Sequence, residues 1–357
     1  MALSKSLLTT LAASAAATLA AGVALADEPD DFNQKGDILI ADQFNNRVIE
    51  INEAGQIVWH WGRGPNDISA ASAVGTNDAL RVGAHTLISG TGVPPGLEPK
   101  CPSGCADNRV FFVNRYGKIT WQYGRFGVTG SGPGQLNTPV QATWTGTHTV
   151  LITDQGNQRV IEVDPATKKI LWQYGMTGVA GSGPNQLNNP NSVEVLDNGT
   201  YLIADENNNR AIVVSRGKKV LQTFTIGGTA SGVAFASRLK NGDTLITDSN
   251  NNRVVEVDAN DKPVWTYVTN TQPGSNPAPL PTRAIRLKNG DTIIADQVND
   301  RVIIVDMAKN LLRQYGNLNV PGYGTDDDRQ GLNWPYDAKV IGEDTGLTHL
   351  GPDPDAP

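Results

Sequence analysis

The stretch Ala41-Asp-Gln-Phe-Asn-Asn-Arg-Val-Ile-Glu-Ile51 joins a small polar cluster to an alternating apolar run. The cluster contains Asp42, Asn45 and Arg47, and the run after it has the two-residue period of a half-buried β-strand. Asp and Asn side chains bond to backbone groups in turns. The planar guanidinium of an arginine bridges a carboxylate and nearby carbonyls. Taken alone, the cluster fits a binding site and a structural turn equally well.

Recurrence of the cluster decides between these two interpretations. The pattern Asp-x-x-Asn-x-Arg, followed by an apolar run, occurs five times, and a reduced copy stands at 107–109. A ligand site is normally used once in a repeat protein, whereas a group repeated in each unit is architectural. We therefore predict that the motif holds turns together. Its residues are Asp42, Asn45, Arg47, Asp154, Asn157, Arg159, Asp205, Asn208, Arg210, Asp248, Asn251, Arg253, Asp296, Asn299 and Arg301.

Each copy of the motif has the same surroundings. A β-rich run such as GDILIAD (36–42) precedes it, and an aromatic run such as VWHWG (58–62) follows. A fourth, proline-led segment such as NPNSVEV (189–195) comes before these three. Four-stranded units at this period are the blades of β-propellers. The sequence therefore predicts an all-β fold, a six-bladed propeller of four-stranded blades.

The two ends of the repeat array predict how the ring closes. The first blade lacks the proline-led strand, and NWPYDAKVIG (333–342) supplies one with no partner strands after it. Closing the ring with this strand would remove exposed sheet edges. We expect the propeller to occupy residues 27–342, with a polar tail at 343–357.

The repeats resemble those of the NHL-repeat family, in which a proline-led strand precedes Gly-x-hydrophobic-hydrophobic-Ala/Thr-Asp-x-x-Asn-x-Arg. Five of the six blades match at Asp, Asn and Arg, and the resemblance covers nearly all of the chain after its N-terminal segment. It implies a six-bladed propeller. The segment at 236–258 is similar to arylsulfotransferase-like propellers, and YGKITW (116–121) to pyrroloquinoline-quinone-binding blades, each over a single stretch.

The N-terminus has the pattern of a secretory signal peptide. Lys5 precedes an alanine-rich apolar run that ends in Ala24-Leu25-Ala26, which predicts a leader at 1–26 and export to a periplasm or the cell exterior. A buried helix or a membrane anchor is the alternative. No later apolar run is long enough to span a bilayer. The formal net charge of -7 argues against a nucleic-acid partner.

The two cysteines, Cys101 and Cys105, form one close pair. In an exported chain such a pair predicts a disulfide that rigidifies a local turn. A redox or metal role is the alternative, although the spacing is Cys-x3-Cys and no histidine lies nearby. The pair lies in an insert (91–106) that replaces the motif of the second blade after Gly90. We expect this insert on the same face as the other motif turns, where it either caps the channel or is a tolerated insertion.

The mouth of the central channel is the expected ligand site. Residues that precede the small residue of each innermost strand differ from blade to blade, as a site requires; they are Asp78, Gln141, Ser192, Phe235, Arg283 and Asp337. Two carboxylates, Asp78 and Asp337, beside Arg283 would suit a calcium ion, a small polar ligand or a peptide. An ordinary salt-bridged, water-filled channel is the alternative.

The scarcity of histidine limits the enzyme classes that fit. None of the four histidines falls on an innermost strand, so neither the metal ligands of an amidating lyase nor the histidine nucleophile of an arylsulfotransferase is present. No Gly-x-Ser-x-Gly elbow occurs. We predict an exported, monomeric binding or scaffold module for a protein, peptide or small polar ligand. The alternatives are a calcium-dependent hydrolase, lactonase or lyase, and a quinone-cofactor oxidoreductase.

Overall fold

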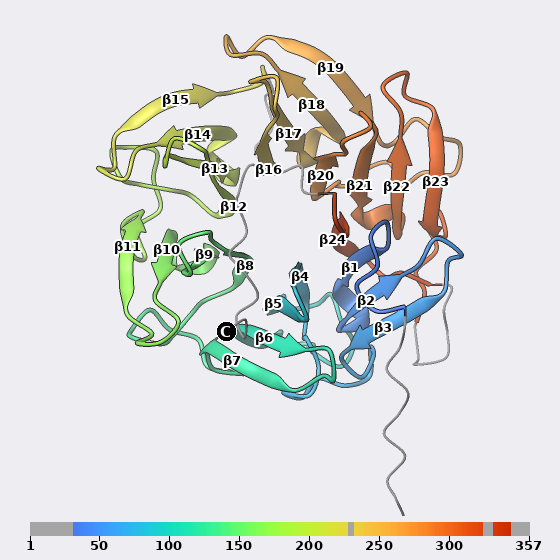
Figure 1. The fold of residues 1–357 in the computed structure, drawn as a ribbon, viewed down its shortest axis with the longest axis horizontal. Helices are drawn as coiled ribbons and strands as arrows, with labels where there is room; N and C mark the ends of the chain where they lie inside the picture. The colour runs from blue at the N-terminus through green and yellow to red at the C-terminus, as the bar shows by residue number, and fades with distance from the viewer. Residues whose placement is uncertain (1–30, 228–231, 324–330, 344–357) are drawn as a thin grey trace, which may run out of the picture. The chain divides into compact units, whose positions relative to one another are not determined.

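The computed structural model of the protein describes residues 31–227, 232–323 and 331–343. The predicted signal peptide, and the predicted tail after Glu343, lie outside these ranges. From Asp31 onward the chain forms six four-stranded antiparallel sheets arranged as blades around an axis (Figure 1). This confirms the predicted all-β, six-bladed propeller.

Each blade runs from an innermost strand to an outermost one. Blade 1 contains β24 (Pro335–Val340), β1 (Ile38–Asp42), β2 (Arg47–Ile51) and β3 (Ile57–Trp61). Blade 2 contains β4 (Thr76–Val82), β5 (His85–Val93), β6 (Cys105–Asn114) and β7 (Ile119–Gly124). Blade 3 contains β8 (Pro139–Trp144), β9 (Val150–Asp154), β10 (Arg159–Val163) and β11 (Ile170–Tyr174). Blade 4 contains β12 (Pro190–Val195), β13 (Tyr201–Asp205), β14 (Arg210–Val214) and β15 (Val220–Phe224). Blade 5 contains β16 (Val233–Arg238), β17 (Thr244–Asp248), β18 (Arg253–Val257) and β19 (Pro263–Val268). Blade 6 contains β20 (Arg283–Arg286), β21 (Thr292–Asp296), β22 (Arg301–Val305) and β23 (Leu311–Gly316).

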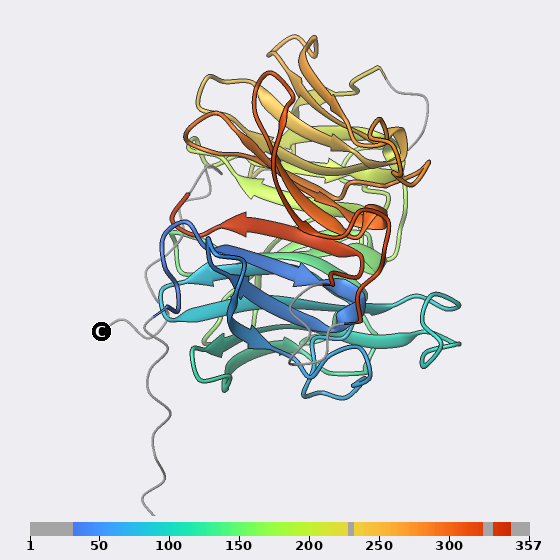
Figure 2. The same cartoon turned by 90° about the vertical axis from the view of Figure 1, so that its right-hand side faces the viewer.

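The ring closes as predicted. β24 pairs antiparallel with β1, in a register that sets Val340 opposite Ile38 and Asp337 opposite Ala41. Figure 2 shows the red β24 alongside the blue β1, although the two are separated by nearly the whole chain. The first blade is thus built from both ends of the propeller, and its sheet has no missing inner edge.

The repeated motif forms the turn between the second and third strands of five blades. The turn is a short 3-10 helix, and the five copies are η1 (Gln43–Asn45), η2 (Gln155–Asn157), η3 (Glu206–Asn208), η4 (Ser249–Asn251) and η5 (Gln297–Asn299). In blade 1 the Asp42 carboxylate is fully buried. It accepts hydrogen bonds from Asn45 (2.8 Å), from Arg47 Nε (2.9 Å) and from the backbone N–H of Asn333 (2.8 Å). These hydrogen bonds, together with the charge of Arg47, offset part of the cost of burying the carboxylate.

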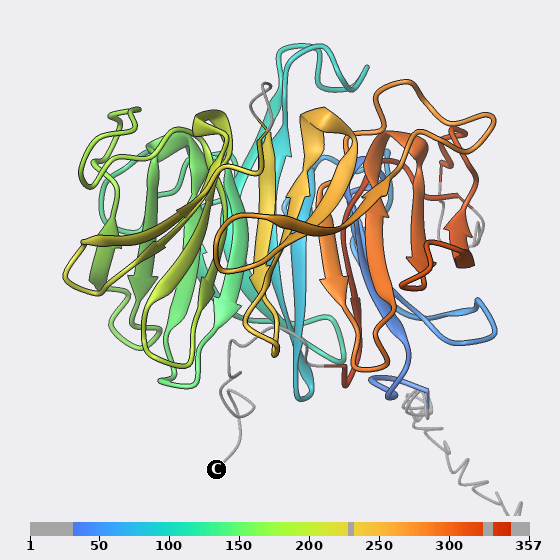
Figure 3. The same ribbon diagram turned by 90° about the horizontal axis from the view of Figure 1, so that it is seen from above.

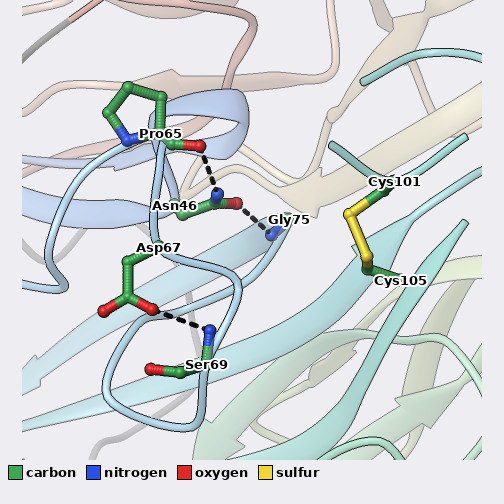
Figure 4. Close-up of a disulfide and its surroundings, with 7 residues drawn as sticks. All are labelled: Asn46, Pro65, Asp67, Ser69, Gly75, Cys101 and Cys105. Carbon is green, nitrogen blue, oxygen red and sulfur yellow. Dashed lines mark hydrogen bonds between the residues drawn. A yellow bond between two sulfur atoms is a disulfide. The ribbon is translucent and has the colours of Figure 1, made fainter. Parts of the chain in front are cut away.

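The residue before the motif arginine connects neighbouring blades. Asn46 adopts the left-handed conformation (φ 50°), which asparagine tolerates well. Its amide oxygen accepts the N–H of Gly75, the residue before β4, at 3.0 Å (Figure 4). Thr138 and Asn189, which precede β8 and β12, are held in the same way by Asn108 and Gln158. The motif therefore fixes both its own blade and the start of the next.

Blade 2 keeps the interaction but moves the aspartate. Gly90 stands where the motif aspartate is expected. It lies opposite Arg109 in the strand register, as Asp42 lies opposite Arg47. Asp107, on the opposite strand, places its carboxylate over Gly90, so closely that a Cβ there would lie 2.4 Å from the carboxyl carbon. It binds Arg109 Nε at 2.5 Å and accepts the N–H of Val74 at 3.0 Å.

The outermost strands also link the blades. In four of them a tryptophan Nε1–H donates to a backbone carbonyl in the turn before the outermost strand of the next blade. The donors Trp59, Trp121, Trp172 and Trp265 bond to Arg115, Pro165, Arg216 and Met307 at 2.8–3.0 Å. The apolar core lies between the faces of neighbouring sheets, and clusters span blade pairs rather than single blades.

Candidate functional site

The six predicted channel residues lie at equivalent positions of the six innermost strands, and all are buried. Four of them accept a hydrogen bond from a backbone N–H on the innermost strand of the next blade. The pairs are Asp337 with Ala79 (3.2 Å), Asp78 with Ala142 (3.1 Å), Gln141 with Val193 (2.7 Å) and Ser192 with Ala236 (3.2 Å). Phe235 cannot accept one; its ring lies 4.3 Å from the guanidinium carbon of Arg283. These side chains therefore connect adjacent blades around the axis.

Three of the predicted residues meet in an ionic cluster with a fourth that the sequence reasoning missed. Arg283 contacts Asp78 at 2.9 Å and Asp337 at 2.5 Å. Lys339 contacts Asp78 at 2.8 Å, Asp337, and the carbonyl of Ala79. Burial raises the pKa of Asp78. For Asp337 burial acts in the same direction, but Arg283 and Lys339 outweigh it and lower the pKa.

The cluster contains two carboxylates and two cations, so its formal charge is balanced. A calcium ion at Asp78 and Asp337 would have to displace the ammonium of Lys339 and the guanidinium of Arg283. Calcium also needs six to eight oxygen ligands, and the described residues contain no group of three or more Asp, Glu, His or Cys side chains suited to a metal. The residues at this position therefore do not fit the calcium site that the sequence suggested.

Two separate cavities lie along the channel, one on each side of this ring, and they share no lining residue. The cavity on the motif-bearing face has a volume of about 580 Å³, and the cavity on the opposite face about 430 Å³. Gln141, Phe235 and Arg283 line the opposite-face cavity. Asp78, Ser192 and Asp337 line neither. Apart from the insert of blade 2, the motif-face cavity is built from residues that the sequence analysis did not select as candidate ligand contacts.

The first residue of each motif turn supplies much of the motif-face cavity. Gln43, Gln155, Glu206 and Gln297 hold this position in η1, η2, η3 and η5, and all four line the cavity. The sequence carried only a weak signal for them. The position holds Gln or Glu in four of the five motif copies and Ser249 in the fifth, while the next residue of the turn and the residue before the arginine also vary.

Hydrogen bonds join the polar side chains of this cavity across blades. Gln297 donates to Gln43 at 2.8 Å, and Gln43 donates to Asn77 at 2.8 Å. Asn191, on β12, donates both to Glu206 and to the hydroxyl of Tyr336, each at 2.8 Å. These bonds fix the orientation of amide groups contributed by blades 1, 2, 4 and 6. Amide side chains offer both donors and acceptors, so the cavity presents preoriented polar groups.

Among the described residues, Glu206 is the only charged one that lines the motif-face cavity. It accepts hydrogen bonds from Asn191 and, at 3.3 Å, from Gln155. Burial raises the pKa of its carboxyl, although hydrogen bonds from Asn191 and Asn189 act in the opposite direction. Across 31–227, 232–323 and 331–343, no Lys or Arg forms an ion pair with Glu206. The carboxyl is thus surrounded by amides and lacks a protein cation.

The insert of blade 2 forms an apolar wall of the same cavity. Figures 2 and 3 show the β5–β6 hairpin projecting beyond the other turns on its side. Its residues Pro94, Pro95 and Leu97 line the cavity. Beside them Phe44 stacks on Trp334 with ring centroids 5.0 Å apart. Of the two interpretations of the insert, its contribution to this cavity favours a role at the channel mouth.

The predicted disulfide between Cys101 and Cys105 is present and closes the end of the hairpin (Figure 4). Cys101 is buried in a small apolar cluster with Phe44, Val74 and Val93. The disulfide therefore holds the hairpin against the aromatic pair at the cavity wall.

The described histidines lie away from both cavities. His60 is exposed on β3, His85 is buried at the start of β5, and His148 stacks on Trp144 in the turn after β8. His349 lies outside the described residues. Within the described ranges, no helix has the length and apolar character needed to cross a membrane.

No protein-family model matches the sequence, and a search of curated proteins found no match. Similarity appears at the level of solved structures. Virginiamycin B lyase from Staphylococcus aureus is 13% identical with a TM-score of 0.52, and the match covers 80% of this chain and 82% of that one. A protein of unknown function from Bacteroides caccae is 14% identical with a TM-score of 0.53, covering 79% and 93%. A streptogramin B lyase is 12% identical with a TM-score of 0.52, covering 80% of both chains. At these identities the likeness shows a shared fold alone, so the chain is a six-bladed β-propeller whose function must be argued from its own cavities.

Proposed function

We propose that this protein is an exported binding module of NHL-repeat type that takes its ligand into the motif-face cavity. The observation that carries the proposal is the cavity of about 580 Å³ with preoriented amides on one side and an apolar wall on the other. Ligand sites in proteins are typically concave, with apolar walls and a few fixed polar groups. The ionic cluster on the axis has balanced charges that pair with one another, which favours a structural role for it.

Export is supported by two features of the chain. The N-terminal segment has the composition of a secretory leader. The disulfide between Cys101 and Cys105 is of a kind that persists in oxidising compartments and is rare in the cytosol. Detection of the mature chain, beginning at Asp27, in a periplasmic or culture-medium fraction would test this part of the proposal.

Matched cavity-filling variants test the binding site. Gln155→Trp places a large side chain at the edge of the motif-face cavity, and Leu80→Trp does the same in the opposite-face cavity. We would screen small polar molecules and short peptides against wild type by saturation-transfer NMR and then repeat the measurement with both variants. We expect Gln155→Trp to lose the signals and Leu80→Trp to keep them. Loss in Leu80→Trp alone would overturn the assignment of the site.

A second candidate function is a lyase or hydrolase that works in the same cavity. The observation that favours it is the pair of titratable groups, Glu206 and Tyr336, linked through Asn191. Burial raises the pKa of both groups, and paired groups with shifted pKa values are common at catalytic sites. In a lyase, Glu206 would accept a proton from carbon while the leaving group departs with the bonding electrons.

Mass spectrometry of reactions with a panel of lactones and linear esters tests this candidate. Hydrolysis adds one water to the product, whereas elimination does not. We expect turnover, if this candidate is correct, to fall at least a hundredfold in Glu206→Gln, because the amide cannot accept the proton. Unchanged turnover in Glu206→Gln would exclude Glu206 as the base.

A further inference from the structure

The motif-face cavity has two chemically different ends. Glu206 belongs to blade 4, whereas Phe44 and Trp334 belong to blade 1, which lies across the axis in the ring order (Figure 1). Tyr336 and Asn191 lie between them, since Asn191 bonds to both Tyr336 and Glu206. A ligand that fills the cavity therefore contacts a carboxyl at one end and an aromatic wall at the other.

In the part of the chain that the structure describes, no positively charged side chain lines the carboxyl end of the cavity. The amides of Asn191 and Gln155 both donate to Oε2 of Glu206, which is the arrangement that stabilises a carboxylate. A partly buried carboxylate without a cation carries a desolvation cost that an incoming cation would offset.

Charged groups on the neighbouring elements are engaged elsewhere. η3 packs against β12, β14 and β16. Arg210 of β14 is paired with Asp205. Arg238 of β16 donates to the carbonyl of Gly242, and its backbone N–H bonds to Glu194 of β12. The titratable group that faces Glu206 is the hydroxyl of Tyr336, through Asn191.

The apolar end is partly open. Trp334 stacks on the buried Phe44, and Leu97 of the hairpin is 47% exposed although it lines the cavity. Large apolar side chains exposed at the rim of a cavity commonly mark a contact surface for a ligand. An aromatic group placed here would stack beside the existing pair.

We infer that the ligand carries a primary ammonium, which pairs with Glu206, joined to an apolar group that packs against Trp334. This is the chemistry of the amino terminus of a peptide with an aromatic residue close to it. The amide groups between the two ends would bond to the peptide backbone. The inference rests on the proposed binding function and names the class of ligand.

Four peptides distinguish the contribution of the ammonium to affinity from the contribution of the aromatic group. We would measure calorimetric binding of Gly-Gly-Trp-amide, its N-acetylated form, Gly-Gly-Ala-amide and N-acetyl-Gly-Gly-Trp with a free carboxylate. We expect Gly-Gly-Trp-amide to bind at least tenfold more tightly than each of the others. Its affinity should fall when the pH is lowered far enough to protonate Glu206, because the neutral carboxyl cannot pair with the ammonium.

Two variants test which end of the motif-face cavity binds the ammonium and which binds the aromatic group. Glu206→Gln keeps the size of the side chain and should abolish both the preference for the free ammonium and the pH dependence. Trp334→Leu should abolish the preference for tryptophan over alanine; leucine suits the left-handed backbone there, because Leu280 holds the equivalent place in blade 6 (φ 48°). Glu53→Gln, which removes an exposed carboxylate from the β2–β3 turn, is the control for net charge.

The outcomes distinguish this inference from the proposed function. Equal binding of the free and acetylated peptides, with both lost in Gln155→Trp, would overturn the ammonium inference and leave the cavity as the site. An unchanged preference in Glu206→Gln would overturn the role of Glu206. If none of the four peptides binds at millimolar concentration the inference fails, and the fragment screen with the two tryptophan variants then decides the proposed function.

Discussion

Buried aspartates are the residues on which each blade depends. All six motif-type aspartates, counting Asp107 of blade 2, are fully buried, and each is matched to an arginine at 2.5–2.9 Å. Since two charges are taken from water together, the pair contributes little by itself, but removal of one partner leaves an uncompensated buried charge. The cost of that removal should depend on how deeply the arginine is buried.

Two arginines at equivalent positions provide the comparison. The Arg301 side chain is 1% exposed and that of Arg253 is 26% exposed. We expect Arg301→Ala to lower the free energy of unfolding by about 3 kcal/mol or more. Arg253→Ala should cost about 1 kcal/mol, because removal of this partly exposed side chain lets water reach Asp248. Urea denaturation measures both, with the exposed Arg313→Ala as control.

Equal losses for the two variants would show that burial of the arginine does not set the cost. Arg47→Ala belongs to the buried class, at 5% exposure. It should lower stability without a specific loss of ligand binding.

Asp300 is the one acid among the residues that precede the motif arginine. This left-handed position holds an amide in the other five blades, whereas blade 6 has an aspartate (φ 54°); the amides are Asn46, Asn108, Gln158, Asn209 and Asn252. Burial raises the pKa of Asp300 to about 7; the N–H of Trp334 opposes this shift, and the charges of Asp42 and Asp296 add to it. Ionising Asp300 in the folded protein is therefore unfavourable.

Asp300→Asn should stabilise the protein at alkaline pH. The folded-state pKa of Asp300 lies above its value in the unfolded chain, so stability falls as pH rises through the interval from about 4 to about 7. We expect the variant to gain about 1–2 kcal/mol at pH 8 and almost nothing at pH 4. Unfolding curves at the two pH values measure the difference; a gain that does not depend on pH would contradict this account.

At the scale of elements, the hairpin of blade 2 is tied down by a very short disulfide loop. Three residues separate the two cysteines, and the entropic stabilisation from so small a loop is modest. The contacts of Cys101 with Phe44 and Val93 are local to the cavity wall. The disulfide should therefore matter for the shape of the site more than for the fold.

Replacing both cysteines by serine tests this distinction. We expect the free energy of unfolding to fall by about 1 kcal/mol or less, while hydrogen exchange speeds up by tenfold or more at the amides of 94–104. A large drop in global stability, with unchanged exchange in the hairpin, would mean that the disulfide supports the whole propeller instead. The measurement is hydrogen exchange followed by mass spectrometry, with urea unfolding in parallel.

The strands and turns were predictable because each is specified locally. The alternation in Val48-Ile49-Glu50-Ile51, the proline at the head of β12 and the motif turn each depend on neighbours within a few residues. The direction in which the first side chain of a turn points does not depend on such neighbours alone. Gln43 and Glu206 face the cavity because six turns converge around one axis, and no single repeat reports where that axis lies.

At the scale of the whole molecule, the ring depends on a strand from the far end of the chain. β24 bonds along β1 and supplies Tyr336, Asp337 and Lys339 to the channel. Without it blade 1 would lose its inner edge, Arg283 would lose its contact with Asp337, and Asp78 would lose its contact with Lys339. Closure therefore joins the folding of blade 1 to that of blade 6.

Truncation after Gly331 tests this coupling. We expect the shortened chain to unfold non-cooperatively and at least 3 kcal/mol less stably, because ladder bonds and buried charges are lost together. Adding a peptide of residues 332–343 should restore a single cooperative transition. A shortened chain that keeps the wild-type transition by circular dichroism would show that the ring does not need its closing strand.

The ring residues illustrate what the sequence could and could not supply for the site. The structure brings Asp78, Arg283 and Asp337 into contact, as an alignment of the repeats places them on neighbouring innermost strands. Their exact partners were not foreseen, because most of these contacts join different blades. Lys339 of blade 1 reaches Asp78 of blade 2, and the N–H groups of Ala79 and Ala142 bond to carboxylates of the preceding blade. Local sequence therefore predicted which strands meet at the axis and allowed a salt-bridged channel as one alternative, but it did not show which groups would neutralise the carboxylates there.

Gly90 and Asp107 carry a consequence for how such repeats are recognised. A search for the linear string Asp-x-x-Asn-x-Arg counts five blades and passes over the second, although its carboxylate and guanidinium meet at 2.5 Å like the others. Blade 2 retains the carboxylate at the same place, although Asp107 supplies it from the opposite strand. The carboxylate fits there because Gly90 has no side chain. A search for the geometry of the carboxylate and the guanidinium, rather than for the sequence pattern, would find all six blades. It would also single out blade 2, in which the segment between the second and third strands forms the hairpin at the cavity instead of the motif turn.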